Sequence, residues 1–142
     1  MVRSVIIALA TLLVGTASGV ASAEDTNQEF LLSASAAPLK LGIAGAIAIK
    51  IDVKPGFHWN DDYPAKLELT GAPDGVTLPK ATLAQLAGDF KSETPTLVNV
   101  AVPAIAATRA SGTITIDAHF SVCNERECRI KKATTTVQIV AQ

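Results

Sequence analysis

Two cysteines near the end of the chain, Cys123 and Cys128, are the residues whose type and spacing suggest chemistry. They enclose the four residues 124–127. A four-residue loop between two strands is a normal hairpin length, and it would set the two cysteines directly opposite each other. Opposed residues at a non-hydrogen-bonded position of an antiparallel pair have Cα atoms about 4.5 Å apart, within reach of a disulfide. The spacing therefore permits a disulfide at the end of a hairpin.

Such a bridge could be structural or reactive. Closing so short a loop removes only about 2 kcal/mol of unfolded-state entropy, and a bridge that serves stability would be expected to span more chain. Cys123 also falls on the polar face of its strand with Asp117, His119 and Ser121, and an exposed short-loop disulfide is a good target for thiol–disulfide exchange. Secreted proteins also carry small hairpin bridges that only staple the fold, so both interpretations stay open.

The residues around the cysteines carry charges of both signs. The basic side chains at 126, 129, 131 and 132 would favour a thiolate, whereas the glutamates at 125 and 127 would oppose it. With the cysteines opposed, Ile130 falls on the polar face, and Arg129 and Lys131 fall on the core face. A β-bulge between 128 and 133 would repair this pattern.

The strand that positions Cys123 is the clearest element of the sequence. Over residues 113–123, apolar side chains alternate with polar ones (Ile114, Ile116, Ala118, Phe120 and Val122 on the apolar face), and this period of two predicts a half-buried strand. Further extended segments are expected over 43–53, 67–69, 76–79, 97–103 and 133–140, with turns over 71–75 and 108–112, and with either one or two helical turns or a loop over 80–88. Many short strands with little helix predict an antiparallel sandwich or barrel.

The composition limits the fold and the partners. The 142 residues fit one domain. The net charge of -1 argues against a nucleic-acid partner, because phosphate binding needs a basic field. The hydrophobic fraction of 49% excludes disorder for most of the chain.

The first residues predict export. One basic residue, Arg3, precedes the apolar run 5–14, and an Ala-x-Ala pattern ends at Ala23, which is typical of a cleaved signal peptide. We therefore expect a signal peptide over 1–23, a flexible leader over 24–38, a folded domain over 39–142 and no membrane span after cleavage. In an exported protein the two cysteines are expected to pair.

Two segments together resemble a known family. Residues 120–128 (FSVCNEREC) are similar to the active-site hairpin of the N-terminal periplasmic domain of the thiol:disulfide interchange protein DsbD, and residues 53–60 (VKPGFHWN) with Pro64 are similar to that family's pGfHiN…P stretch. The order of elements agrees from about 39 to 140. The resemblance implies an immunoglobulin-like antiparallel β-sandwich in the bacterial periplasm that exchanges disulfides with thioredoxin-like or membrane carrier proteins.

The resemblance also implies roles for individual residues. Cys128 would be the nucleophile that forms mixed disulfides, and Cys123 would resolve them. Phe90 lies where the family has a cap loop over the pair, and His58 and Asn60 would lie beside the cysteines. The family usually has an apolar residue and prolines after the second cysteine, whereas residues 129–132 read RIKK here. The family also continues into membrane and thioredoxin-like domains, whereas this chain ends at residue 142, so we expect either that it works with separate partners or that it has lost the relay role.

Other chemistries have weaker support. His58, His119 and the cysteines could bind Cu(I) or Zn, but neither histidine has close ligand spacing to the cysteines, and no metal or other cofactor is expected. His119 is expected on the strand surface opposite Lys132. The aromatic residues at 57, 59 and 63 are expected to plug one end of the sandwich, and the acidic pair at 61–62 is expected to be solvated.

We therefore expect a thiol–disulfide exchange module that uses Cys123 and Cys128, and the sequence leaves open whether it acts as an enzyme in its own right. The alternative is a non-catalytic secreted binding or assembly module in which the bridge is a staple. The sequence does not define the partner or the direction of electron flow.

Overall fold

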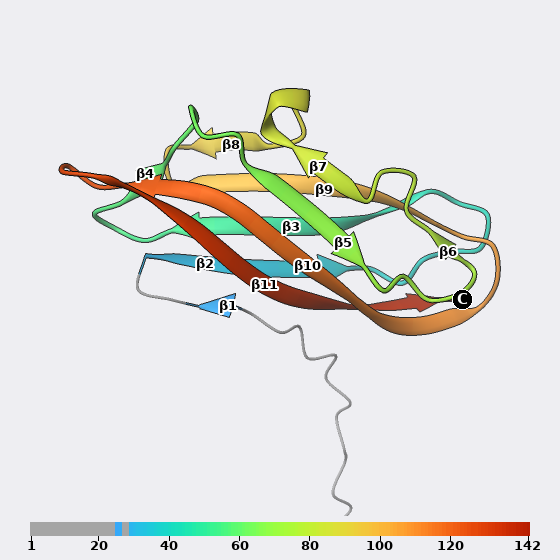
Figure 1. The fold of residues 1–142 in the computed structure, drawn as a ribbon. Helices are drawn as coiled ribbons and strands as arrows, with labels where there is room; N and C mark the ends of the chain where they lie inside the picture. The colour runs from blue at the N-terminus through green and yellow to red at the C-terminus, as the bar shows by residue number, and fades with distance from the viewer. Residues whose placement is uncertain (1–24, 27–28) are drawn as a thin grey trace, which may run out of the picture.

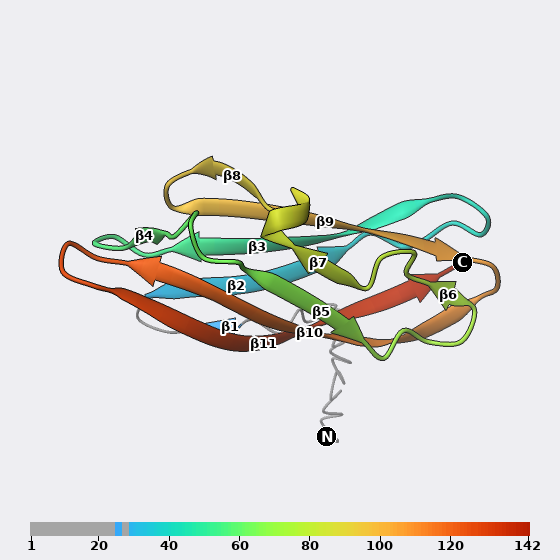
Figure 2. The ribbon, with the colours of Figure 1, turned by 45° about the horizontal axis from the view of Figure 1, so that its top comes forward.

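The computed structural model describes residues 25–26 and 29–142. This part of the chain forms two antiparallel β-sheets that face each other (Figures 1 and 2). The first sheet has the order β1-β2-β3-β9-β6, and β8 also pairs with β9. Its strands are β1 (Asp25–Thr26), β2 (Phe30–Ala36), β3 (Gly45–Val53), β6 (Val76–Thr77), β8 (Lys91–Thr94) and β9 (Leu97–Ala106).

The second sheet has the order β11-β10-β5-β7, and the short strand β4 also pairs with β10. Its strands are β4 (His58–Trp59), β5 (Lys66–Thr70), β7 (Thr82–Ala84), β10 (Ala110–Cys123) and β11 (Cys128–Ala141). A single 3-10 turn, η1 (Gln85–Ala87), follows β7 and ends at Gly88, whose φ of 78° suits glycine.

This strand order is that of an immunoglobulin-like domain. Immunoglobulin sandwiches place strands A-B-E-D in one sheet and G-F-C in the other. Here β2, β3, β9 and β8 stand in the first order, and β11, β10 and β5 stand in the second. The predicted all-β, immunoglobulin-like antiparallel sandwich is confirmed.

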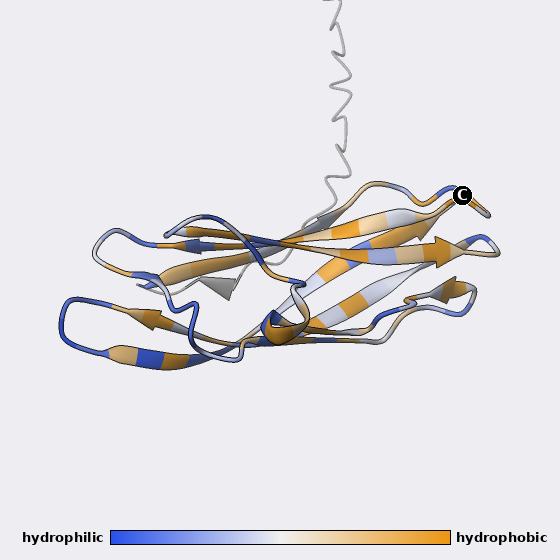
Figure 3. Cartoon of the chain, turned by 90° about the horizontal axis from the view of Figure 1, so that it is seen from above, coloured by the Kyte–Doolittle hydropathy of each residue, from blue (hydrophilic) through white to orange (hydrophobic). Residues whose placement is uncertain are grey.

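The core lies between the sheets and follows from the period-two pattern of the strands. Every second residue is buried from Ile47 to Val53 in β3, along β9 and from Ile114 to Val122 in β10. The residues between them are mostly small or polar and at least partly exposed, except Ser121 near the end of β10. Figure 3 shows this alternation along the strands and a hydrophilic tip on the β10–β11 hairpin. That tip lies at the end of the molecule away from the C-terminus (Figure 1).

Two predictions about the amino-terminal part have different outcomes. The predicted signal peptide 1–23 lies outside the described residues. The flexible leader predicted over 24–38 is wrong where the structure describes it, because β2 is a strand of the first sheet whose Phe30 and Leu32 are buried in the core. The Ser/Ala-rich composition obscured an alternating strand whose outward side chains are Leu31, Ser33 and Ser35.

Several element boundaries also differ from the prediction. The last strand begins at Cys128 rather than at 133, and β10 begins at Ala110, inside the predicted turn 108–112. The strands β4 and β8 lacked an alternating pattern long enough to predict. In the described part of the chain no helix has the length and apolar character needed to cross a membrane.

Candidate functional site: the hairpin disulfide

The two cysteines form the predicted bridge at the end of the longest ladder of the fold. β10 and β11 pair without interruption from Ala110 opposite Ala141 to Cys123 opposite Cys128. Cys123 and Cys128 are disulfide-bonded, and their Cα atoms are 3.9 Å apart. This short separation fits the closely spaced, non-hydrogen-bonded position of an antiparallel pair.

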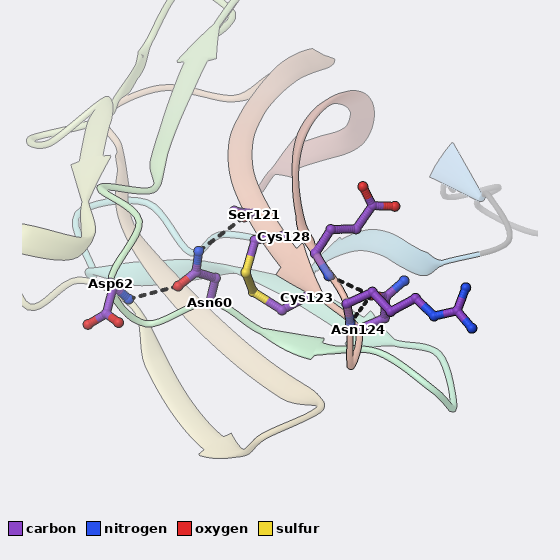
Figure 4. Close-up of a disulfide and its surroundings, with 8 residues drawn as sticks. Asn60, Asp62, Ser121, Cys123, Asn124 and Cys128 are labelled. Atoms are coloured by element: carbon purple, nitrogen blue, oxygen red, sulfur yellow. Dashed lines mark hydrogen bonds between the residues drawn. A yellow bond between two sulfur atoms is a disulfide. The ribbon is translucent and has the colours of Figure 1, made fainter.

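The hairpin tip is closed by hydrogen bonds as well as by the bridge. The backbone N–H of Asn124 donates to the carbonyl oxygen of Glu127 at 2.9 Å. The side-chain Oδ1 of Asn124 accepts from the backbone N–H groups of Arg126 at 2.8 Å and Glu127 at 2.9 Å (Figure 4). An asparagine that holds a turn in this way is a common local device, and it closes the loop independently of the sulfur atoms.

The bulge that the sequence suggested between 128 and 133 is absent. The register is continuous, so Arg129 and Lys131 do lie on the core face of β11, opposite Val122 and Phe120. At this end of the sandwich both cations pair with the carboxylate of Glu29, just before β2. The partner carboxylate comes from the segment predicted to be a loose leader, so sequence patterning could not supply it.

This ion-pair cluster ties the first sheet to the hairpin. Glu29 is only 8% exposed. Its hydrogen bond from Lys131, with a further one from Arg129, lowers the pKa of the Glu29 carboxyl despite the cost of burial. Hydrogen bonds to Glu127 and Glu29 raise the pKa of the Arg129 guanidinium. The cluster therefore holds its charges at neutral pH.

The two cysteines differ in exposure. Cys128, whose direction the sequence pattern left open, is exposed. Cys123 is only 6% exposed, so the prediction that it lies on an open polar face is wrong. Its neighbour on that face, Ser121, is also buried at 2% exposure. The cause is β4 and the residues after it, which cover this edge of β10.

Pairing between β4 and β10 places the predicted site residues beside the bridge. His58 lies opposite Cys123, and Trp59 lies opposite Val122. The next residue, Asn60, donates its backbone N–H to the carbonyl oxygen of Ser121 at 3.0 Å and its side-chain Nδ2 to the Ser121 Oγ at 3.2 Å (Figure 4). Ser121 was not among the predicted site residues, although its place two residues before Cys123 puts it on the same face of β10.

Phe90 contacts this region through an aromatic stack. Its ring stacks on Trp59 with centroids 5.7 Å apart, and Trp59 stacks in turn on Phe120 at 5.4 Å. Phe57 and Tyr63 are half-buried and pack against the core. Phe57, Trp59 and Tyr63 close the sandwich beneath the cysteine end, as expected. Phe90 stacks on the inward-facing Trp59 rather than on the disulfide, so the structure does not place it as a cap over the cysteine pair.

The remaining candidate residues lie on the surface. His119 is exposed and pairs with Lys132 across the ladder, as predicted. Asp61 and Asp62 are exposed, and Asp61 accepts a hydrogen bond from Ser92 at 3.1 Å. Among residues 25–26 and 29–142, no group of three or more histidine, cysteine or acidic side chains is placed to hold a metal ion.

Comparisons with known proteins identify no family. No family model matches the chain, and no curated protein sequence matches it. Among solved structures, the chain is similar to AggA of Escherichia coli, the major subunit of aggregative adherence fimbriae type I, with 11% identity and a TM-score of 0.40. The match covers 82% of this chain and 98% of AggA.

Proposed function

We propose that the protein exchanges its Cys123–Cys128 disulfide with thiols of partner proteins. The observation that carries this proposal is the asymmetry of the bridge. An exposed sulfur-bearing residue, Cys128, is bonded to a buried one, Cys123, at the outermost pair of a projecting hairpin. An incoming thiolate must approach one sulfur in line with the bond that breaks, and exposure decides which sulfur it meets.

The hairpin has little need of the bridge for its shape. Backbone pairing runs the full length of β10 and β11, and Asn124 closes the tip with three hydrogen bonds. The six-residue loop would contribute only about 2 kcal/mol in the chain-entropy model. A bond whose opening leaves the hairpin intact is suited to reversible chemistry.

The exchange has two balanced steps. The thiolate of a reduced partner dithiol attacks the Cys128 sulfur, a mixed disulfide forms, and Cys123 leaves as a thiolate. The second thiol of the partner, once deprotonated, then attacks the partner's own sulfur in that mixed disulfide and releases the Cys128 thiolate. The partner dithiol loses two electrons and becomes a disulfide, while this protein gains them.

The partners that fit are proteins with an exposed redox dithiol, such as thioredoxin-like or membrane thiol–disulfide carriers in the periplasm. The resemblance of residues 120–128 and 53–60 to the N-terminal domain of DsbD supports this choice. That resemblance also implies that Cys128 is the cysteine that forms the mixed disulfide, which agrees with its exposure.

A non-catalytic binding or assembly module with a structural staple is the competing function. The burial of Cys123 favours it, because a sealed sulfur is hard to reach. The reduction potential separates the two functions. A potential below about -300 mV indicates a structural bridge, and a higher one indicates exchange.

Trapping tests the proposal directly. A Cys123→Ala variant leaves the exposed Cys128 free and is expected to accumulate disulfide-linked partner proteins when it is expressed with its signal sequence. The matched Cys128→Ala variant leaves the buried Cys123 and is expected to trap far fewer. If both variants remain unlinked and the potential lies below the structural limit, the exchange function is wrong.

A further inference from the structure

Cys123 has two neighbours across the sheet. Cys128 lies opposite it on β11, and His58 lies opposite it on β4. Directly opposed residues of antiparallel strands point to the same face, with Cβ atoms about 4.5–5.5 Å apart. The three side chains therefore form one row across the hairpin end, and the positions that carry the imidazole and the Cys123 sulfur are directly adjacent.

The two ends of this row differ in their contact with water. His58 is exposed, whereas Cys123 is 6% exposed. A thiolate at a buried position lacks hydration and needs a nearby positive charge or a proton. Histidine is the side chain that changes its charge between pH 5 and 8, and it can exchange protons with solvent. His58, the neighbour of Cys123 on β4, can therefore supply the positive charge or the proton that a Cys123 thiolate needs.

The next row along the sheet is neutral and does not compete for this role. Asn60 and Ser121 bond to each other there, with Ile130 opposite Ser121. The charged groups of the flanking loops and of the row that holds His119 have both signs (Lys54, Asp61, Asp62, Lys66, His119, Glu125, Arg126, Glu127 and Lys132). Of these, Glu125 and Arg126 share a surface hollow with Gly56, and their charges oppose each other. None of these charged groups stands directly opposite Cys123, whereas His58 does.

We propose that His58 is the acid–base partner of Cys123 in disulfide exchange. This inference rests on the proposed exchange function and deepens it. When a partner thiolate attacks Cys128, the sulfur–sulfur bond breaks and its electron pair stays on Cys123. The imidazolium of His58 stabilises that thiolate and delivers a proton to it, and the neutral imidazole then takes a proton from solvent. In the reverse direction the imidazole removes the proton from the Cys123 thiol.

A thiol titration tests the pair without any partner. In a Cys128→Ser variant, the Cys123 thiolate is followed by its ultraviolet absorbance across pH 4–11. Adding His58→Gln is expected to raise the pKa of the Cys123 thiol by about one unit, because the positive neighbour is lost. His119→Gln is the matched control, since it removes the other histidine of the chain, two rows away, and is expected to leave the titration unchanged. An unchanged titration with His58→Gln overturns the proposal.

Reduction kinetics on the intact bridge give a second readout that needs no cysteine replacement. Dithiothreitol reduction of the otherwise unmodified protein is followed from pH 5 to 9. His58→Gln is expected to slow reduction several-fold below pH 7 and to remove the histidine-dependent part of the pH profile. The same profile for both proteins overturns the acid–base role. If protein dithiols fail to reduce the bridge while His58→Gln still shifts the thiol titration, the exchange function fails and the His58–Cys123 pair stands.

Discussion

At the scale of single residues, position on the sheet decides the properties of each cysteine. Both belong to the same outermost pair of the hairpin, yet β4 covers Cys123 and leaves Cys128 exposed. On the opposite face, Arg129 and Lys131 turn toward Glu29 instead of toward the bridge. These two cations, which follow Cys128 in the chain, therefore support the fold and do not face the sulfur atoms.

The Glu29 cluster leads to a stability prediction. Glu29→Gln removes the charge that pairs with Arg129 and Lys131, and it is expected to lower the free energy of unfolding by about 2 kcal/mol, the scale of a hydrogen bond to a charged group. Urea denaturation at pH 7 measures the change. Glu127→Gln, which removes the exposed partner of Arg129, is the control and should cost much less. Equal losses for the two variants would contradict the assigned importance of burial.

The same carboxyl predicts how stability changes with pH. The pKa of Glu29 is lowered from 4.5 in the folded protein, and the pKa of Asp89 is lowered from 3.8 by its hydrogen bonds to Lys80 and the Ala84 backbone. Between the folded and unfolded pKa values, the unfolded chain binds more protons than the folded protein. The stability that these two carboxylates contribute is therefore fully present above their unfolded pKa values and is lost as the pH falls through their folded pKa values. The urea midpoint should drop from pH 6 to pH 3, and Glu29→Gln should drop less. An equal drop in the variant would show that Glu29 does not contribute.

At the scale of elements, the β10–β11 hairpin is a continuous ladder whose tip projects from the sandwich (Figure 2). Pairing with β5 and β4 covers the other edge of β10, so the strand is held on both sides. The bridge joins residues that the ladder has already brought together. Its opening is therefore a local event.

This arrangement predicts that the hairpin survives without its sulfur atoms. A Cys123→Ser/Cys128→Ser double variant is expected to remain folded and to lose no more than about 2 kcal/mol of unfolding free energy. The fluorescence of Trp59, the one tryptophan of the chain, follows the unfolding. Asn124→Ala, which removes two hydrogen bonds of the tip with the bridge intact, is the comparison. A double variant that does not fold would identify the bridge as a staple.

At the scale of the whole molecule, the sandwich depends on β2, a strand whose Ser/Ala-rich sequence did not predict a strand. β2 places Phe30, Leu32 and Ala34 into the core and pairs with β3 along its whole length. The ring of Phe30 packs edge-on against Phe120 of β10, with centroids 4.9 Å apart. The strand thus joins the two sheets beneath the cysteine end.

A core substitution tests this role of β2. Leu32→Ala is expected to destabilise the protein by about 3 kcal/mol, because a fully buried leucine leaves a cavity. Ser33→Ala, the next residue on the outward face, is the control and should change stability little. Thermal unfolding followed by circular dichroism measures both. If Leu32→Ala is as stable as Ser33→Ala, β2 does not contribute to the core and the prediction is wrong.

The sequence was informative where a pattern was long and local. The alternation over 113–123 predicted β10 and its inward face, and the four-residue spacing predicted the opposed cysteines. Short strands such as β4 and β8 carry too few residues to show a period. The pattern at Arg129 and Lys131 was misread as a bulge, because the buried carboxylate that accepts both cations lies a hundred residues away in the chain.

By itself, then, the sequence determined an all-β sandwich and a cysteine pair able to bond across a hairpin end, since both follow from side-chain period and from loop length. Only the tertiary structure decided that Cys123 is covered while Cys128 is exposed, and that His58 stands opposite the covered sulfur. Those facts depend on which strand lies beside the edge of β10. The packing of the whole sandwich determines which strands lie side by side when they are far apart in the chain, and a local sequence pattern does not contain this information.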